Sequence, residues 1–115
     1  FRRVLFRSLD NMKTTNLRVI AAVAGGGVPG AESSMLKIRG TEIRQEINAL
    51  TRRAMGVYAR PFTQDMLDAA NDGPSFGPDF AAAASAQYFN NRKLSIFGGS
   101  NEIQKNIISK MILGL

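Results

Sequence analysis

The chain has 115 residues, 44% of them hydrophobic, and no apolar run of the roughly 20 residues that a membrane span requires, so it predicts one modest cytoplasmic domain. It contains no Cys and no His, which excludes disulfides, zinc sites and a histidine base. The net charge of +6 suggests a comparison with nucleic-acid-binding proteins, so the position of the positive charge matters.

The first eight residues, FRRVLFRS, hold three of the 15 basic residues and none of the nine acidic ones. They read as the translation of a common sequencing adapter, so we expect residues 1–8 to be non-native and residues 9–115 to be an N-terminally truncated part of a longer protein. The alternative is a genuine basic amphipathic start. Without these eight residues the net charge falls from +6 to +3, which weakens a nucleic-acid role.

A first helix is predicted over residues 9–24, because apolar residues recur there at intervals of three and four: Leu17, Ile20, Ala21 and Ala24. The segment 25–34, GGGVPGAESS, interrupts it, and Ser33 or Ser34 is expected to cap the next helix. Three of its glycines also match the G-x-G-x-x-G spacing of dinucleotide-binding folds. Because Pro29 removes one N–H from that loop and no second strand follows, we interpret the segment as an interhelical turn.

The second predicted helix is the clearest element, with a charged face opposite one apolar stripe: Leu36, Gly40, Ile43, Ile47, Leu50 and Ala54. Gly40 would let a neighbouring backbone approach this stripe, and Gly56 is expected to follow the helix in a left-handed conformation. Irregular chain is predicted after it, with short helices over residues 63–70 and 87–96. The closing helix is predicted over residues 100–113, with its apolar side formed by Ile103, Ile107, Ile108, Met111 and Ile112.

The junction before the closing helix, IFGGSNEIQ, is the best candidate for a ligand site. Gly98 and Gly99 permit positive φ and lack Cβ atoms, so a ligand can lie against the backbone. The N–H groups of the following helix start suit phosphates or sugar hydroxyls. The alternative is an ordinary tight turn in which Ser100 is an N-cap and Glu102 stabilises the first turn.

Two segments, KLSIFGGSNEIQKNIISKMILGL and ESSMLKIRGTEIRQEI, resemble the C-terminal domain of the acyl-CoA dehydrogenase family. GPDFAAAASAQYFNNRK is most similar to the large subunit of pimeloyl-CoA dehydrogenase and its bacterial relatives. The resemblance implies an all-α fold, in which residues 9–115 form part of a C-terminal four-helix bundle. In the family an all-helical domain and a β-domain precede that bundle.

The resemblance implies that FAD is bound by the loop and helix start at Gly99, Ser100, Asn101 and Glu102. Gly56 is a weaker candidate, since in relatives this turn reaches the FAD of a neighbouring subunit, and Arg53 stands where relatives often have Gln. Gly98 occupies the position of the catalytic Glu of many relatives, so we expect no catalytic residue here. The base would lie on a preceding helix or on a partner subunit.

The implied function is α,β-dehydrogenation of an acyl-CoA thioester by a bacterial, cytoplasmic, homo- or hetero-oligomeric flavoprotein that reduces an electron-transfer flavoprotein. This segment would clamp FAD and contribute to subunit contacts. We expect no nucleic-acid partner. Alone, it is expected to be inactive, poorly stable and free of flavin. The alternatives are a flavin-dependent oxidase or monooxygenase on the same fold, and a basic helical binding module.

Overall fold

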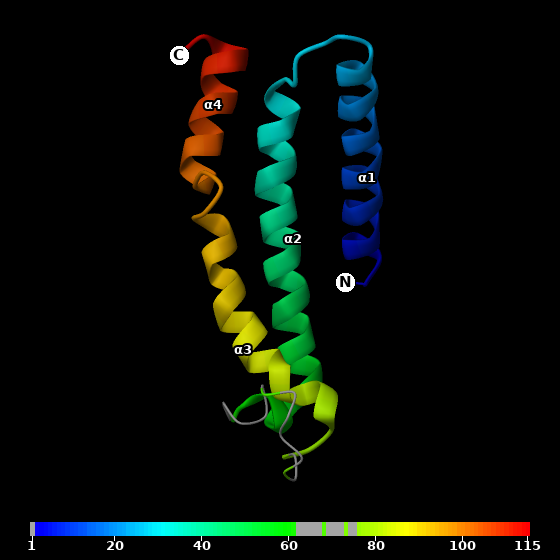
Figure 1. Cartoon of the computed structure of the whole chain (residues 1–115), viewed down its shortest axis with the longest axis vertical. Coiled ribbons are helices and arrows are strands. Elements are labelled where there is room, and N and C mark those ends of the chain that lie inside the picture. Colours follow the sequence, from blue (N-terminus) through cyan, green and yellow to red (C-terminus); the bar gives the residue numbers. More distant parts are fainter. Residues whose placement is uncertain (1, 62–67, 69–72, 74–75) are drawn as a thin grey trace. The chain divides into compact units, whose positions relative to one another are not determined.

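The computed structural model describes residues 2–61, 68, 73 and 76–115, with residues 2 and 3 described by their backbone alone (Figure 1). Within this part of the chain all regular structure is helical, which confirms the predicted all-α class. The elements are α1 (Arg2–Ala24), α2 (Ala31–Met55), η1 (Gly56–Ala59), η3 (Asp79–Ala81), α3 (Ala82–Asn90), η4 (Asn91–Ser95) and α4 (Asn101–Leu113). None of the described helices is long and apolar enough to cross a bilayer.

The chain divides into two compact units. The first unit comprises Phe1–Ile43 and Leu94–Leu115, and therefore holds α1, the N-terminal part of α2, and α4. The second comprises Arg44–Lys93, with the C-terminal part of α2 and α3.

The starts of α1 and α2 differ from the predicted ones. α1 begins at Arg2 and not at residue 9, because no Gly or Pro interrupts the preceding residues. α2 begins at Ala31, so the prediction that Ser33 or Ser34 caps it was wrong. The helix forms immediately after Pro29 and Gly30, and the Ser33 N–H already donates to the Gly30 carbonyl at 3.2 Å.

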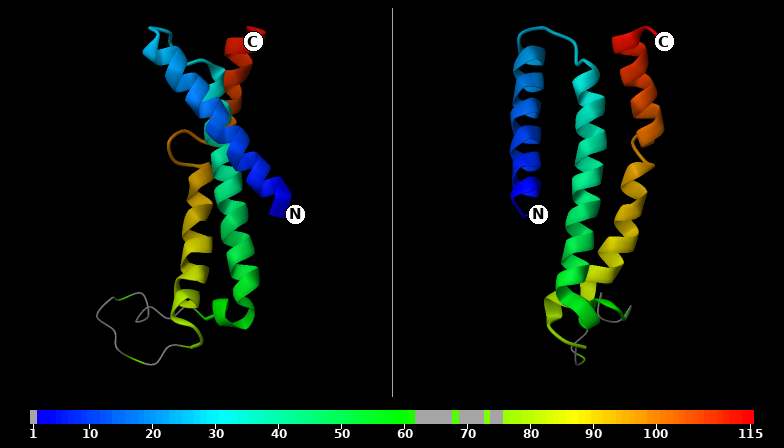
Figure 2. Two further views of the ribbon diagram at one scale, coloured as in Figure 1. Left: turned by 90° about the vertical axis from the view of Figure 1, so that its right-hand side faces the viewer. Right: turned by 180° about the vertical axis from the view of Figure 1, so that it is seen from behind.

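In the first unit, α1 and α4 flank the N-terminal half of α2 (Figures 1 and 2). A Cβ atom on Gly40 would lie 3.2 Å from the Met12 methyl, so Gly40 accommodates a side chain of α1 and not, as predicted, a backbone. On the α4 side, Lys37 Nζ donates to Asn101 Oδ1 at 2.9 Å, and Thr41 Oγ1 donates to the Leu94 carbonyl at 3.4 Å. Small and polar groups therefore hold this unit together.

The buried face of α2 is more polar than the predicted stripe. Of the six stripe residues only Ile43 is buried, at 4% exposure. The other buried residues of α2 are Ala31, Ser34, Thr41 and Asn48. The last three follow one another at intervals of seven, which places them on one side of the helix. The apolar pattern of the sequence does not reveal these polar residues as buried. A hydroxyl group can be buried at little cost when it forms a hydrogen bond within the helix, as Thr41 Oγ1 does with the Lys37 carbonyl.

In the second unit, α3 begins at Ala82, earlier than the predicted start at residue 87. The alanine run that we assigned to irregular chain is thus helical, in keeping with the high helix propensity of Ala. Ala81, Ala84 and Ser85 are buried, and the Ser85 hydroxyl donates to the Ala59 carbonyl of η1. The helix predicted for residues 63–70 falls, except for Asp68, outside the described residues.

The closing helix is confirmed. α4 spans Asn101–Leu113, Ser100 is its N-cap, and Gly114 follows it with φ +70°. No residue of α4 is buried, and the side formed by Ile103, Ile107 and Met111 is 37 to 56% exposed. The apolar side that the sequence predicted is therefore uncovered in this chain.

Candidate functional site

The loop before α4 turns on two glycines in the left-handed region. Gly98 has φ +69° and Gly99 has φ +84°, conformations that residues with a Cβ rarely adopt. A Cβ on Gly98 would meet no atom within 4 Å, whereas one on Gly99 would lie 2.5 Å from Gln104 Nε2. Gln104 Nε2 also donates to the Gly98 carbonyl at 3.4 Å. Gly98 thus borders open space, while Gly99 is fitted against the first turn of α4.

Ser100 accepts hydrogen bonds from backbone N–H groups in the first turn of α4. Its backbone is extended, its Oγ accepts from the Ile103 N–H at 3.3 Å, and its carbonyl accepts from the Gln104 N–H at 2.9 Å. The predicted N-cap is therefore present. Because the Glu102 N–H donates to its own carboxyl, the Asn101 N–H is the foremost donor of the helix.

Glu102 folds back over this helix start. A hydrogen bond from its own backbone N–H, and then one from the Ser100 hydroxyl, hold the pKa of the exposed Glu102 carboxyl below its usual value. The charges of Lys105 and Lys37 act in the same direction. The carboxylate is thus ionised at neutral pH, where it can accept hydrogen bonds from ligand hydroxyls.

Lys37 is a site residue that the sequence did not reveal. Its Nζ donates to Asn101 Oδ1 at 2.9 Å, which brings a cation from α2 to the N-terminus of α4. The two residues are 64 positions apart, and on α2 a single lysine resembles any other solvent-facing charge. Only the packing of α2 against α4 identifies it.

The structure brings four of the five predicted cofactor-binding residues together, since Gly99, Ser100, Asn101 and Glu102 are consecutive at the start of α4. The fifth, Gly56, belongs to the second unit, with Arg53. Gly56 has φ +57° directly after the end of α2, which confirms its predicted left-handed conformation. These two groups of residues therefore belong to different units.

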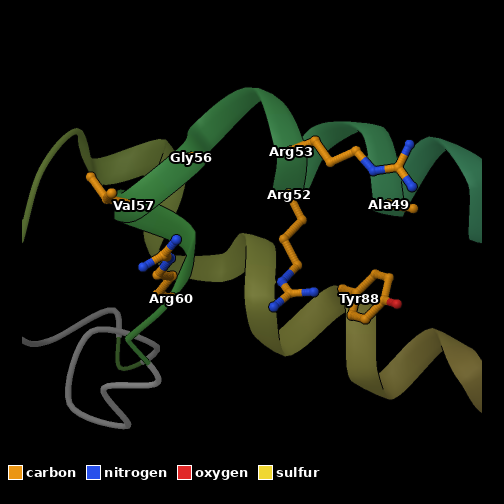
Figure 3. A pocket seen from close by; sticks show the side chains of 7 residues that line it. All are labelled: Ala49, Arg52, Arg53, Gly56, Val57, Arg60 and Tyr88. Carbon is orange, nitrogen blue, oxygen red and sulfur yellow. The ribbon is translucent and has the colours of Figure 1, made fainter.

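Arg53 and Gly56 border a pocket of about 320 Å³ in the second unit (Figure 3). The described residues that line it come from the last turns of α2, from η1 and the residue that follows it, and from α3: Ala49, Arg52, Arg53, Gly56, Val57, Arg60 and Tyr88. In Figure 3, Arg52 extends toward the Tyr88 ring, whereas Arg53 runs along α2 toward Ala49. In the part of the chain that the structure describes, no group of three or more His, Cys, Asp or Glu residues could hold a metal ion.

A protein-family model matches most of the chain. A family model described as "Acyl-CoA dehydrogenase, C-terminal domain" matches residues 6–113, a range that includes both the α4 loop and the pocket. No curated protein and no solved structure gives a significant match.

Proposed function

Because this chain belongs to the acyl-CoA dehydrogenase family through its C-terminal domain, we propose that it clamps FAD in an enzyme that dehydrogenates an acyl-CoA thioester. The observation that carries the proposal is the start of α4, where two positive-φ glycines lead into a capped helix with a lysine beside it. The full-length enzyme would transfer its electrons to an electron-transfer flavoprotein.

The residues at this helix start have the chemistry that the adenosine and diphosphate side of FAD requires. Gly99 presents backbone without a side chain, and the Glu102 carboxylate can accept hydrogen bonds from ribose hydroxyls. A diphosphate would be repelled by Glu102 but attracted by Lys37 and by the positive end of the helix dipole. Ser100 and Asn101 orient these two charged side chains through hydrogen bonds.

FAD, when bound, supplies the hydride acceptor of the reaction. The reaction also needs a proton acceptor, and Gly98 has no side chain that could act as one. Glu102 is a poor substitute, because hydrogen bonds to its ionised form lower its pKa and so its basicity. We therefore place the catalytic base outside residues 98–102.

Subunit contacts are the second part of the proposal. The exposed side of α4 is an apolar strip formed by Ile103, Ile107 and Met111, and no residue of α4 is buried. Such a strip favours contact with another protein surface. We propose that it lies in the interface of a homo- or hetero-oligomer.

The test of the cofactor site compares two glycines that flank α4, in the full-length enzyme. Gly99→Ala and Gly114→Ala both place a Cβ at positive φ, +84° and +70°, but only Gly99 lies in the proposed FAD loop. We expect Gly99→Ala to lower the FAD bound per protein, measured by flavin absorbance, by about tenfold, since it disturbs the contact with Gln104. Gly114→Ala should retain FAD. Equal FAD content in the two variants contradicts the proposed site.

The reaction class is tested separately by mixing the flavin-loaded enzyme with acyl-CoA in the absence of oxygen. A dehydrogenase or an oxidase bleaches its flavin under these conditions, and air then distinguishes the two, because only the oxidase is rapidly reoxidised without an electron-transfer flavoprotein. A flavin that stays oxidised points to a monooxygenase. Gly98 leaves this alternative open, because it lacks the expected carboxylate, whereas the proposed flavin-binding residues Gly99 to Glu102 are all present.

A further inference from the structure

The loop of residues 95–100 is bonded to α2 at both of its ends. Before the loop, the Leu94 carbonyl accepts from Thr41 Oγ1 at 3.4 Å. After the loop, Asn101 Oδ1 accepts from Lys37 Nζ at 2.9 Å. The two donors lie four residues apart, so they share one face of α2, and all of these residues belong to the first unit. One face of α2 therefore holds both ends of the loop that contains the two positive-φ glycines.

Large side chains contribute little to fixing this loop. Ile96 is 70% exposed, Phe97 is 53% exposed, and no residue of the following helix α4 is buried. Glycine loses more conformational freedom on ordering than any other residue, so a loop with two adjacent glycines needs other contacts to keep one conformation. Hydrogen bonds suit this purpose because they restrict both distance and direction. The bonds from α2 supply such contacts at the two residues that flank the loop.

Thr41 is oriented for its contact by its own helix. It is 8% exposed, and its hydroxyl also donates to the Lys37 carbonyl at 2.8 Å, so one proton is shared between that carbonyl and the Leu94 carbonyl. Thr51 forms the same kind of bond to the Ile47 carbonyl at 2.9 Å, but it is exposed and this bond stays within α2. Stabilisation of α2 accounts for Thr51, whereas the buried Thr41 also reaches the chain that enters the loop.

Lys37 is bonded where the loop ends. Its side chain is half-buried, and its Nζ forms a charge-assisted hydrogen bond to Asn101, the first residue of α4. A lysine on a solvated helix face keeps its ammonium group in water, so a surface role does not explain this contact. The charge of Lys37 would also act on a bound anion, whereas the uncharged Thr41 affects a ligand through the loop.

We propose that Lys37 and Thr41 are positioning residues that hold the loop of residues 95–100 in its ligand-binding conformation before the ligand arrives. Lys37 acts through Asn101, and Thr41 acts through the Leu94 carbonyl. A loop that is already ordered loses less conformational entropy on binding, which raises its affinity without new contacts to the ligand. The identification of the ligand as FAD rests on the proposed function, whereas the ordering of the loop rests on the hydrogen bonds alone.

The order of the loop is measured by hydrogen exchange in the full-length enzyme without flavin. The probes are the Ile103 and Gln104 N–H groups, which bond to Ser100 at the end of the loop. Lys37→Met and Thr41→Val should each speed this exchange severalfold, because a released loop lets the first turn of α4 open more often. The proposal is overturned if exchange in both variants equals that of the wild type.

Two further threonine variants separate the contact with the loop from helix stability. Thr41→Ser keeps the hydroxyl, and its exchange should be close to that of the wild type. Thr51→Val is the matched control, because it removes a threonine hydroxyl that bonds within α2. Circular dichroism of each variant shows whether the helices remain intact. If Thr51→Val speeds exchange at the start of α4 as much as Thr41→Val does, the effect belongs to α2 and the proposal is overturned.

A double-mutant cycle tests whether Lys37 acts through Asn101. If it does, Asn101→Ala should speed exchange as much as Lys37→Met, and the double variant should exchange no faster than either single one. Effects that add in the double variant would show that the two side chains act independently, which contradicts the positioning role of Lys37. Because no flavin is present in these measurements, attraction between Lys37 and a ligand does not contribute.

The consequence for the cofactor is measured as the dissociation constant of FAD from the reconstituted enzyme. Lys37→Met should weaken binding by about tenfold and Thr41→Val severalfold, with Thr41→Ser close to the wild type. If Thr41→Val binds FAD as tightly as the wild type while Gly99→Ala loses FAD, the positioning role is overturned. A failure of the proposed function differs from this, because Gly99→Ala would then retain FAD while the exchange results would still report the ordering of the loop.

Discussion

At the scale of single residues, the Ser100 side chain makes two contacts at the start of α4, with Ile103 and with Glu102. The Ser100 oxygen accepts from the Ile103 N–H, and its hydroxyl donates to the Glu102 carboxylate. A serine followed by an acidic residue at a helix start is visible in the sequence, and it was interpreted as a cap there. The sequence does not predict that the Glu102 carboxylate accepts from its own N–H and from Ser100, because a carboxylate in the first turn of a helix can accept from several donors.

Glu102 should make the stability of the protein depend on pH in a defined direction. Because the folded-state pKa of its carboxyl is lowered, the stabilisation is present above the ordinary glutamate pKa of about 4.3 and is lost as the pH falls through the lower folded value. We expect Glu102→Gln to reduce the free energy of unfolding in urea at neutral pH and to have a smaller effect at about pH 3.

The control for this titration is Glu46→Gln, which removes a charge that is also exposed but lies in the middle of α2. It should show little difference from the wild type at either pH. If Glu102→Gln is as stable as the wild type at neutral pH, the contacts at the helix start do not contribute to stability.

At the scale of helices, α1 and α2 approach each other at Gly40. Glycine in a helix interior costs about 1 kcal/mol relative to Ala, so a glycine in the middle of α2 needs a packing reason. Met12 supplies one, because its methyl would lie 3.2 Å from a Cβ at this position. That contact is closer than usual, but it involves the far end of a flexible side chain, which can rotate away.

We therefore expect Gly40→Ala to stabilise the protein by about 0.5 to 1 kcal/mol, because the gain in helix propensity exceeds the cost of moving Met12. Thermal unfolding followed by circular dichroism measures the change. Gly40→Val, which adds two further carbons and a β-branch, should instead lower the melting temperature. A lower melting temperature for Gly40→Ala would show that Met12 cannot move.

At the scale of the whole molecule, the described residues bury small side chains and leave large ones exposed. No large side chain is fully buried among them, and the buried apolar residues are Ala31, Ile43, Ala59, Ala81 and Ala84. Such burial provides limited hydrophobic stabilisation, since the free energy gained is proportional to the apolar area removed from water. Further surfaces are therefore needed to cover strips such as the exposed side of α4.

The double variant Ile103→Asp/Met111→Asp should abolish association through this side of α4. Each exposed apolar side chain is worth about 1.5 to 3 kcal/mol when buried, so the dissociation constant should rise at least a hundredfold. Analytical ultracentrifugation measures the change. Asn106→Asp adds a charge to an exposed polar position of the same helix and should leave association intact. Association that survives the double variant would assign the interface to another surface.

The sequence was sufficient to predict the helical class and the two clearest helices, because their apolar periods, the Ser100 cap and the glycine at 56 are local signals that need no partner. It also located the loop at Gly98 and Gly99. Tertiary structure alone decided which side of α2 is buried, brought Lys37 to Asn101, and gathered Arg60 and Tyr88 around one pocket with Arg52. These features join residues distant in the chain, and the periodicity of one helix carries no information about its neighbours.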